Sequence, residues 1–159
     1  MKKNPADKKF SDNMGAGQYT LEGFLGTDQR QIAEIINEDQ AKLDQLGVRA
    51  EDLAILLRRL SRAGMTGLGE AVEYRGYEIS VDEWRGWLGC PFKDAKRAAK
   101  RLSSCRHLAS GRELKWSDLS IHLIADHGFF QGRGAAHRIE PEELYNFLLP
   151  LIEAEAKED

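Results

Sequence analysis

Apolar residues recur at helical spacing in two neighbouring segments near the start of the chain. Thr27 and Asp28 are residue types that cap helices, and apolar side chains then follow every three or four positions until Gly47. Gly47 can take the left-handed conformation that ends a helix. The same spacing returns in residues 53–60 and stops before Gly64. These segments predict two helices that form an antiparallel hairpin.

The spacing then changes to the alternation of a half-buried strand. Residues 71–84 alternate about an Arg75-Gly76 pair that suits a turn, so they predict a β-hairpin. Residues 93–103 stay open between a helix, which their alanines and basic residues favour, and a loop or strand. The residues that follow, up to Trp116, are typical of a second hairpin with a glycine in its loop.

Two more helices are predicted toward the end of the chain. Ser117 suits the N-cap of a helix with a buried apolar stripe, and Gly128 suits its end. Pro141 can occupy the first turn of a final helix. Pro150 is expected to kink or shorten that helix, because proline lacks a backbone N–H.

Length and composition agree with one domain. A chain of 159 residues is long enough to bury roughly two thirds of its unfolded surface. No internal repeat or low-complexity linker divides its body. Residues 20–159 are therefore predicted to form a single α+β domain, with the two-helix hairpin and C-terminal helices packed on a small, mostly antiparallel sheet. Residues 1–19 hold few bulky apolar side chains and predict a flexible tail.

Charge, hydropathy and cysteine content exclude several classes of protein. A net charge of -3, with 31% charged and 42% hydrophobic residues, favours neither nucleic acid nor membrane overall. No apolar run approaches the roughly 18 residues that a membrane span requires. Two cysteines do not make a disulfide-rich scaffold, and the N-terminus lacks the apolar segment of a signal peptide. We therefore expect a cytoplasmic protein without membrane contact.

Three fragments resemble a group of small bacterial cytosolic proteins that have no assigned function. They are FLGTD at residues 24–28, GCPF at residues 89–92 and WSDLSIHLIADHGFF at residues 116–130. The resemblance covers most of the chain after residue 19. It implies a bacterial cytoplasmic protein with a second hairpin before the third fragment, and it brings no activity, cofactor or functional residue.

Cysteine and histidine side chains suit a zinc site, although their spacing is not that of a zinc finger. The candidate ligands, with His107 in reserve, are Cys90, Cys105, His122 and His127. On a helix the last two would point roughly 140° apart, unless the helix unwinds near Gly128. The opposing interpretation is that the cysteines act as small hydrophobic residues and the histidines satisfy caps or carbonyls. No cofactor is the first expectation, and zinc is the alternative.

Asp118, His122 and Asp126 stand four positions apart on one predicted helix, so two carboxylates could flank an imidazole. Such a helix could form a pH-sensitive contact or hold a general acid and base. However, the sequence has no GxSxG or HExxH motif and no phosphate-binding glycine loop. The balance therefore favours a protein that is not an enzyme.

Basic residues are concentrated in residues 93–106. The candidates for phosphate contacts are Lys96, Arg97, Lys100 and Arg101. Trp84 and Trp87 lie just before them and could stack on bases. The acidic residues 140–159 offer another explanation, since the basic stretch could meet the acidic terminal helix of its own fold or of a partner.

The first expectation for function is a non-enzymatic binding module that contacts a partner protein or a second copy of itself. At least one of the adjacent Phe129 and Phe130 should anchor its loop, and an exposed one would mark an interaction surface. The candidate contact residues are Trp84, Trp87, His122, His127, Phe129, Phe130 and Arg133. Nucleic-acid binding is the alternative, and a small zinc- or histidine-dependent site protein or enzyme comes third.

Overall fold

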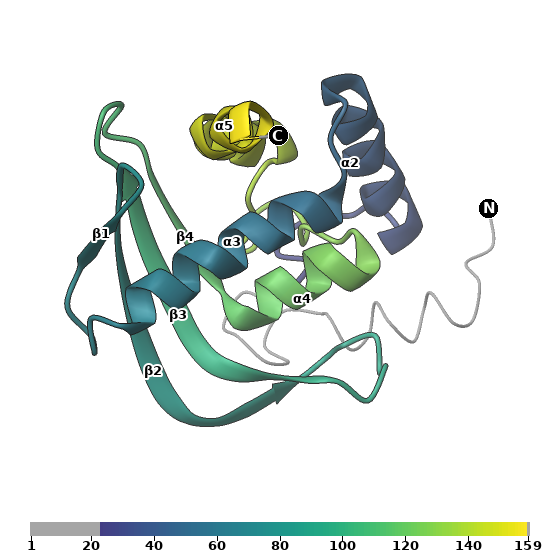
Figure 1. Ribbon diagram of the computed structural model, residues 1–159. Coiled ribbons are helices and arrows are strands. Elements are labelled where there is room, and N and C mark those ends of the chain that lie inside the picture. The colour runs from purple at the N-terminus through teal and green to yellow at the C-terminus, as the bar shows by residue number, and fades with distance from the viewer. Residues whose placement is uncertain (1–22, 159) are drawn as a thin grey trace.

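Both predicted N-terminal helices form, but they open away from each other. The computed structural model describes residues 23–158, and in it α2 (Ile32–Leu46) and α3 (Ala50–Met65) are joined across Gly47, which has a φ of 72°. Figure 1 shows α2 at a steep angle to α3. α3 packs on the sheet and on the fourth helix, whereas α2 contacts the last helix. The predicted tail, residues 1–19, lies outside the described residues.

Asp28 does not cap α2. The helix begins at Ile32, and its N-cap residue, Gln31, makes no side-chain capping bond. The Asp28 carboxylate instead accepts hydrogen bonds from the backbone N–H and the guanidinium of Arg30 and from the backbone N–H of Arg133. The aspartate therefore joins the start of the described chain to a distant loop.

The sheet has four antiparallel strands in the order β1, β2, β3, β4. Their bounds are β1 Val72–Tyr74, β2 Tyr77–Gly89, β3 Arg97–His107 and β4 Glu113–Ser117. Arg75 and Gly76, with φ values of 47° and 87°, make the predicted two-residue turn between β1 and β2. The α+β class and the antiparallel sheet are therefore confirmed.

Residues 97–103, which the sequence left open, are strand. They pair with β2 along its C-terminal half, so backbone pairing overrides the helical preference of the alanines. β2 is longer than the alternation predicts and has an irregularity between Trp84 and Trp87. Together β2 and β3 form a long curved hairpin that reaches beneath the helices (Figure 1).

Helices α3 and α4 (Asp118–His127) lie on the concave face of the sheet (Figure 1). Gly64 of α3 allows close packing there, because a Cβ at this position would lie 2.7 Å from Ile79 Cγ2. Ser61 of α3 accepts a hydrogen bond from the buried Trp116 indole at 2.8 Å, and its hydroxyl lies 2.7 Å from that of Ser103. These bonds satisfy the polar groups that the α3–sheet interface buries.

The final helix, α5 (Pro141–Glu158), continues through Pro150. Pro150 therefore does not shorten the helix. The apolar face of α5 packs into the main core through residues such as Leu144 and Phe147. The buried Tyr77 hydroxyl of β2 donates a 2.6 Å hydrogen bond to the Phe147 carbonyl, which ties α5 to the sheet.

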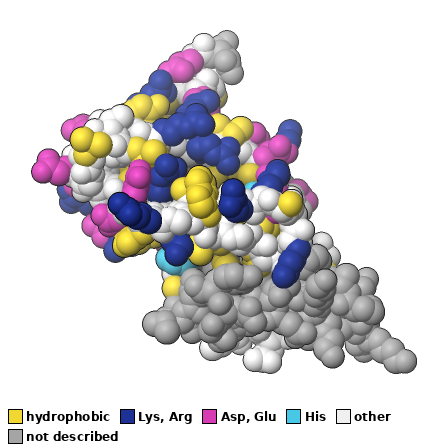
Figure 2. Space-filling model, turned by 90° about the horizontal axis from the view of Figure 1, so that it is seen from below, with side chains coloured by type: hydrophobic (Ala, Val, Ile, Leu, Met, Phe, Trp, Pro, Cys, Tyr) yellow, Lys and Arg dark blue, Asp and Glu magenta, His cyan; other side chains and the backbone are white. Residues whose placement is uncertain are grey.

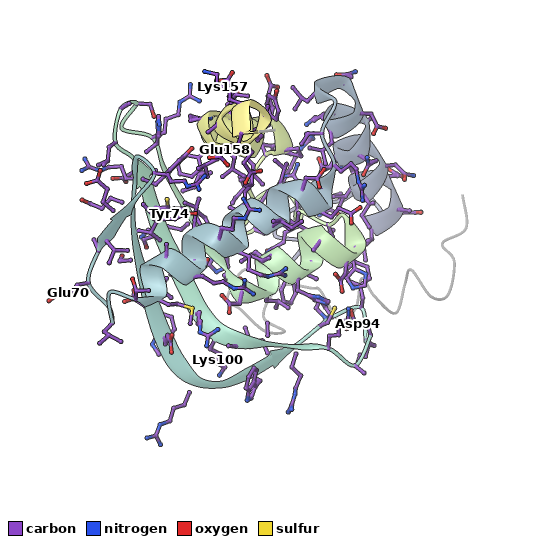
Figure 3. All side chains as sticks on the ribbon, in the orientation of Figure 1. Glu70, Tyr74, Asp94, Lys100, Lys157 and Glu158 are labelled. Carbon is purple, nitrogen blue, oxygen red and sulfur yellow. The ribbon has the colours of Figure 1, made fainter. Side chains whose placement is uncertain are left out.

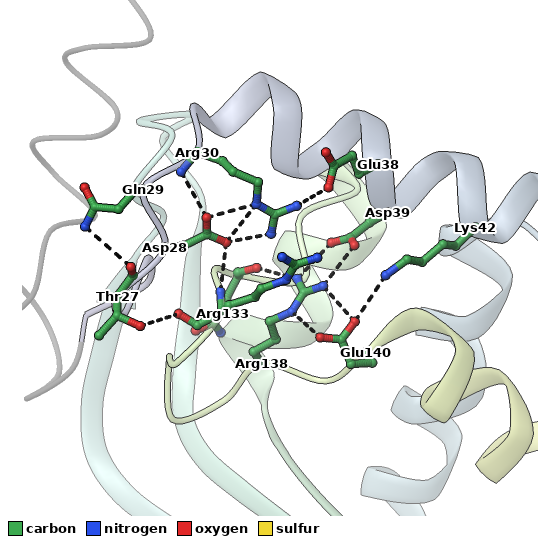
Figure 4. Close-up of polar contacts among 11 residues, drawn as sticks. Thr27, Asp28, Gln29, Arg30, Glu38, Asp39, Lys42, Arg133, Arg138 and Glu140 are labelled. Atoms are coloured by element: carbon green, nitrogen blue, oxygen red, sulfur yellow. Dashed lines mark hydrogen bonds and ion pairs between the residues drawn. The ribbon is translucent and has the colours of Figure 1, made fainter.

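A buried ion pair fixes the loop between α4 and α5 (Figure 4). The guanidinium of Arg138 donates to both carboxylate oxygens of Asp39 at 2.9 Å, and only 4% and 1% of these two side chains is exposed. Arg138 also donates to Glu140 and to the carbonyl of Gln131. This bidentate geometry holds the loop against α2.

We predict that Asp39→Asn lowers the free energy of unfolding by about 3 kcal/mol, because it leaves the buried Arg138 guanidinium without its main counter-charge. Glu38→Gln on the same helix, whose carboxylate is half exposed and pairs with Arg30, should cost less than about 1 kcal/mol. Urea unfolding of both variants measures the difference. Equal losses of unfolding free energy in the two variants would contradict a larger contribution from the buried Asp39–Arg138 pair.

Candidate metal centre

The loop between β2 and β3 presents two potential ligands from a fixed backbone. The Cys90 N–H donates to the Lys96 carbonyl at 3.1 Å, and the Lys93 N–H donates to the Cys90 carbonyl at 3.0 Å. Asp94 Oδ1 accepts from the Lys96 N–H at 3.0 Å, which closes a tight turn. Figure 3 shows Asp94 at the tip of this hairpin, close to α4. The other carboxylate oxygen is left to face the helix.

α4 supplies two histidines beside this loop. Its start is the predicted cap, in which the Ser117 hydroxyl accepts from the Ser120 N–H at 3.0 Å. Its end is the predicted Gly128, with a φ of 60°. The helix does not unwind before His127, yet the rings of His122 and His127 lie 5.3 Å apart. The expected divergence of the two imidazoles is therefore wrong, because both side chains reach toward the same hairpin loop.

Four potential ligand atoms converge at this point. Asp94 Oδ2 lies 2.9 Å from His122 Nε2 and 2.8 Å from His127 Nε2. Cys90 Sγ lies 3.5 Å from His127 Nε2. The four atoms all lie within 4.8 Å of one another. Tetrahedral zinc requires ligand atoms about 3.3–3.6 Å apart, so side-chain shifts of less than about 1 Å would create the coordination sphere.

The groups around the histidines suit metal ligation. His122 Nδ1 lies 3.3 Å from the Asp126 carboxylate, and Asp126 pairs with Lys96. A proton on Nδ1 would leave the Nε2 lone pair for a metal, as in the carboxylate–histidine pairs of zinc proteins. The His127 ring stacks on Phe92 at 4.2 Å between centroids, which fixes its plane.

The cluster lies between solvent and a small apolar core. Cys90 is 7% exposed and packs with Phe24, Leu119, Leu123 and Phe129. This burial raises the pKa of the Cys90 thiol to about 11. The thiol is therefore protonated at neutral pH without a metal, and a bound cation would have to displace its proton.

The Asp94 carboxylate has the opposite tendency. Although desolvation opposes the charged form, the Lys96 backbone N–H and the two histidines hold the pKa of Asp94 well below its usual range. Asp94 is thus an anion throughout the physiological range of pH. A persistent anion beside two imidazoles favours cation binding.

Two of the expected ligands lie elsewhere. Cys105 is in the middle of β3, opposite Ile79, and is buried in the main core. Burial raises the pKa of the Cys105 thiol to about 12. His107 contacts the Tyr77 ring and the Ser110 hydroxyl. The predicted ligand set is therefore wrong at Cys105, because Cys90 and Cys105 occupy distant parts of the hairpin.

Asp94 takes the place that Cys105 was expected to fill. The sequence contains a signal for this ligand, since Asp94 follows Cys90 within a few residues and is a carboxylate among basic residues. The prediction that the Asp118 and Asp126 carboxylates flank His122 is correct for Asp126 only. Asp126 contacts the ring, whereas Asp118 pairs with Arg101 at 3.1 Å.

The aromatic residues expected to contact a partner divide into two groups. Phe129 and Phe130 are 0% and 2% exposed and anchor their loop in the two cores, so the structure contradicts their role as surface contacts. Trp84 and Trp87 are 58% and 60% exposed on the β2–β3 hairpin. Arg133 is exposed in the loop after α4.

The acidic terminal helix does not neutralise the basic stretch. Glu155 and Glu158 of α5 pair with Arg59 and Arg75, outside residues 93–106. Within that stretch, Lys96 and Arg101 pair with carboxylates on α4, and Arg101 also pairs with Glu83 on β2. The Arg97 guanidinium lies 5.6 Å from the centre of the Trp87 ring. Lys100 is half-buried opposite Trp84.

Comparisons of the chain with protein-family models, curated proteins and solved structures find no match. The resemblance of the three fragments to small bacterial proteins stays a prediction. Within residues 23–158, no helix is long and apolar enough to cross a membrane.

We predict that Asp126→Asn weakens zinc binding about 10- to 100-fold, because it removes the carboxylate that orients His122. Asp118→Asn is the matched control on the same helix, and its zinc affinity should stay close to wild type. Competition with a chromophoric chelator measures both affinities. Equal effects of the two substitutions would mean that Asp126 does not orient the ligand.

Proposed function

We propose that the protein is a zinc-dependent binding module in which Cys90, Asp94, His122 and His127 hold one structural zinc ion. The observation that carries this proposal is the convergence of the four ligand atoms within 4.8 Å. One thiolate, one carboxylate and two imidazoles are ligand types that zinc accepts. Burial of Cys90 and the orienting contact of Asp126 with His122 support the same conclusion.

Four protein ligands favour a structural role over catalysis. A catalytic zinc typically keeps three protein ligands and an open position for water, whereas a structural zinc is closed by four. The proposed ion would join the tip of the β2–β3 hairpin to the end of α4. It would thereby fix the strands that carry the exposed Trp84 and Trp87. The binding activity belongs to this hairpin surface.

The location that fits this proposal is the cytoplasm. Both cysteines are free, and the proposed ligand set requires Cys90 as a reduced thiol. A reducing compartment keeps this thiol available to the metal.

The test is the zinc content and stability of protein purified without chelator. We expect about one zinc per chain in the wild type, and loss of the metal in Asp94→Ala and His122→Ala. Cys105→Ser is the matched control for Cys90→Ser, because only Cys90 lies in the cluster. Chelator should lower the unfolding temperature of the wild type and the Cys105→Ser protein alike.

Two results would overturn the proposal. One is a folded wild-type protein that takes up no zinc during dialysis against it. The other is zinc retained by Cys90→Ser but lost from Cys105→Ser. The Asp94 variant carries particular weight, because its carboxylate distinguishes this ligand set from one built of cysteine and histidine alone.

A further inference from the structure

A basic cleft lies where α3, α4 and the β2–β3 hairpin meet. Its volume is about 600 Å³, and its walls include Arg58 and Arg62 of α3, Trp87 of β2, and Arg97 of β3. Sites for small ligands and cofactors typically measure about 300–1,000 Å³. The cleft is therefore large enough to hold a nucleotide unit of a longer chain.

Positive charge exceeds negative charge in this cleft. Its cationic side chains are Arg58, Arg62, Lys96, Arg97 and Arg101. Its two carboxylates are Asp118 and Asp126, and both are engaged by cations of the same cleft. Asp118 accepts from Arg101 at 3.1 Å, and Asp126 accepts from Lys96 at 2.5 Å. The charges of these two pairs cancel, and the remaining three arginines give the cleft a net positive charge.

Those three arginines are available to a ligand. Arg58, Arg62 and Arg97 are all exposed, and within residues 23–158 none of them forms an ion pair with a carboxylate. They come from two elements, α3 and β3, that both line the cleft. Guanidinium groups so placed suit the phosphates of an anionic ligand.

An exposed aromatic ring adds a second kind of contact. Trp87 is 60% exposed, lines the cleft and lies beside the Arg97 guanidinium. Figure 2 shows Lys and Arg side chains gathered around exposed hydrophobic side chains on the face seen from below. Aromatic rings among cations provide the base-stacking and phosphate contacts of proteins that bind single strands.

We propose that this cleft binds single-stranded nucleic acid, with Arg58, Arg62 and Arg97 on the phosphates and Trp87 stacked on a base. The proposal differs from the expectation drawn from the basic stretch alone. Lys96 and Arg101 are held by carboxylates of α4, whereas Arg58 and Arg62 enter from a helix more than thirty residues earlier in the chain.

The side chains that line the cleft favour a single strand over a duplex or an acidic peptide. A duplex keeps its bases stacked, so it would not offer a base to Trp87. An acidic peptide would use the arginines but has no need of the exposed indole. The combination of both features is what an unpaired nucleotide requires.

This inference names the ligand of the binding module proposed above, and it rests on that proposal in one respect. The zinc would hold the hairpin that forms one wall of the cleft, and His122 belongs to both sites. None of the three arginines nor Trp87 is a proposed zinc ligand. Their substitution therefore tests the cleft without removing the metal site.

The experiment measures fluorescence anisotropy of a labelled single-stranded oligothymidylate of about 12 nucleotides, titrated with the full-length protein at low ionic strength. We expect binding that weakens steeply with salt. The Arg62→Glu, Arg97→Glu double variant should bind at least about tenfold more weakly. Trp87→Ala should weaken binding about fivefold or more through lost stacking.

The matched control is an Arg85→Glu, Arg112→Glu double variant, which changes the net charge equally at exposed positions outside the cleft. Its affinity should stay within about twofold of wild type. Circular dichroism and zinc content, measured on every variant, show whether the fold and the metal site are intact.

Three outcomes would overturn the inference. The first is that the protein does not bind the oligonucleotide, and the second is that the cleft variant and the control variant weaken binding equally. The third is that a duplex or a glutamate-rich peptide binds more tightly than the single strand, with an affinity that Trp87→Ala does not change. Zinc without oligonucleotide binding would refute the cleft and leave the metal centre. Oligonucleotide binding with the expected variant pattern but no zinc would refute the metal centre and leave the cleft.

Discussion

One carboxylate oxygen connects the β2–β3 hairpin to helix α4, the two elements that carry the candidate metal centre. Asp94 Oδ2, at the tip of the β2–β3 hairpin, lies within 2.9 Å of the imidazoles of His122 and His127 on α4. Around this contact, the hairpin also meets α4 through the Lys96–Asp126 ion pair, the stacking of Phe92 on His127 and the small apolar cluster that contains Cys90. A carboxylate shared by two imidazoles beside a buried thiol is also the arrangement that a divalent cation would occupy. The same interaction thus serves the fold and defines the candidate metal centre.

The rest of the protein provides a rigid support for that contact. The Trp116–Ser61–Ser103 hydrogen bonds fix α3 on the sheet, and the Asp39–Arg138 pair fixes the loop that follows α4. With both ends of α4 held, its histidines stay aimed at the hairpin. The same hairpin carries Trp87 and Arg97, which line the basic cleft together with His122 of α4. The candidate metal centre and the cleft are therefore neighbouring sites on the β2–β3 hairpin.

Local rules predicted much of the fold. Ser117 and Gly128 bound α4, and Arg75-Gly76 makes a tight turn, because capping and turn preferences act over a few residues. Two kinds of feature were not accessible. Strand β3 depends on pairing with β2 rather than on its own alanines, and the opening of α2 from α3 depends on packing against α5. At the site, Cys90, His122 and His127 were predicted, whereas Asp94 replaced Cys105 because only the pairing register of the hairpin decides which side chains reach α4.

The most direct test of the central claim is X-ray absorption spectroscopy at the zinc edge of the zinc-loaded protein. The proposed site predicts one sulfur ligand at about 2.3 Å and three nitrogen or oxygen ligands at about 2.0–2.1 Å. The sulfur contribution should disappear in Cys90→Ser. A shell with two sulfur ligands, or with none in the wild type, would contradict coordination by Cys90, Asp94, His122 and His127.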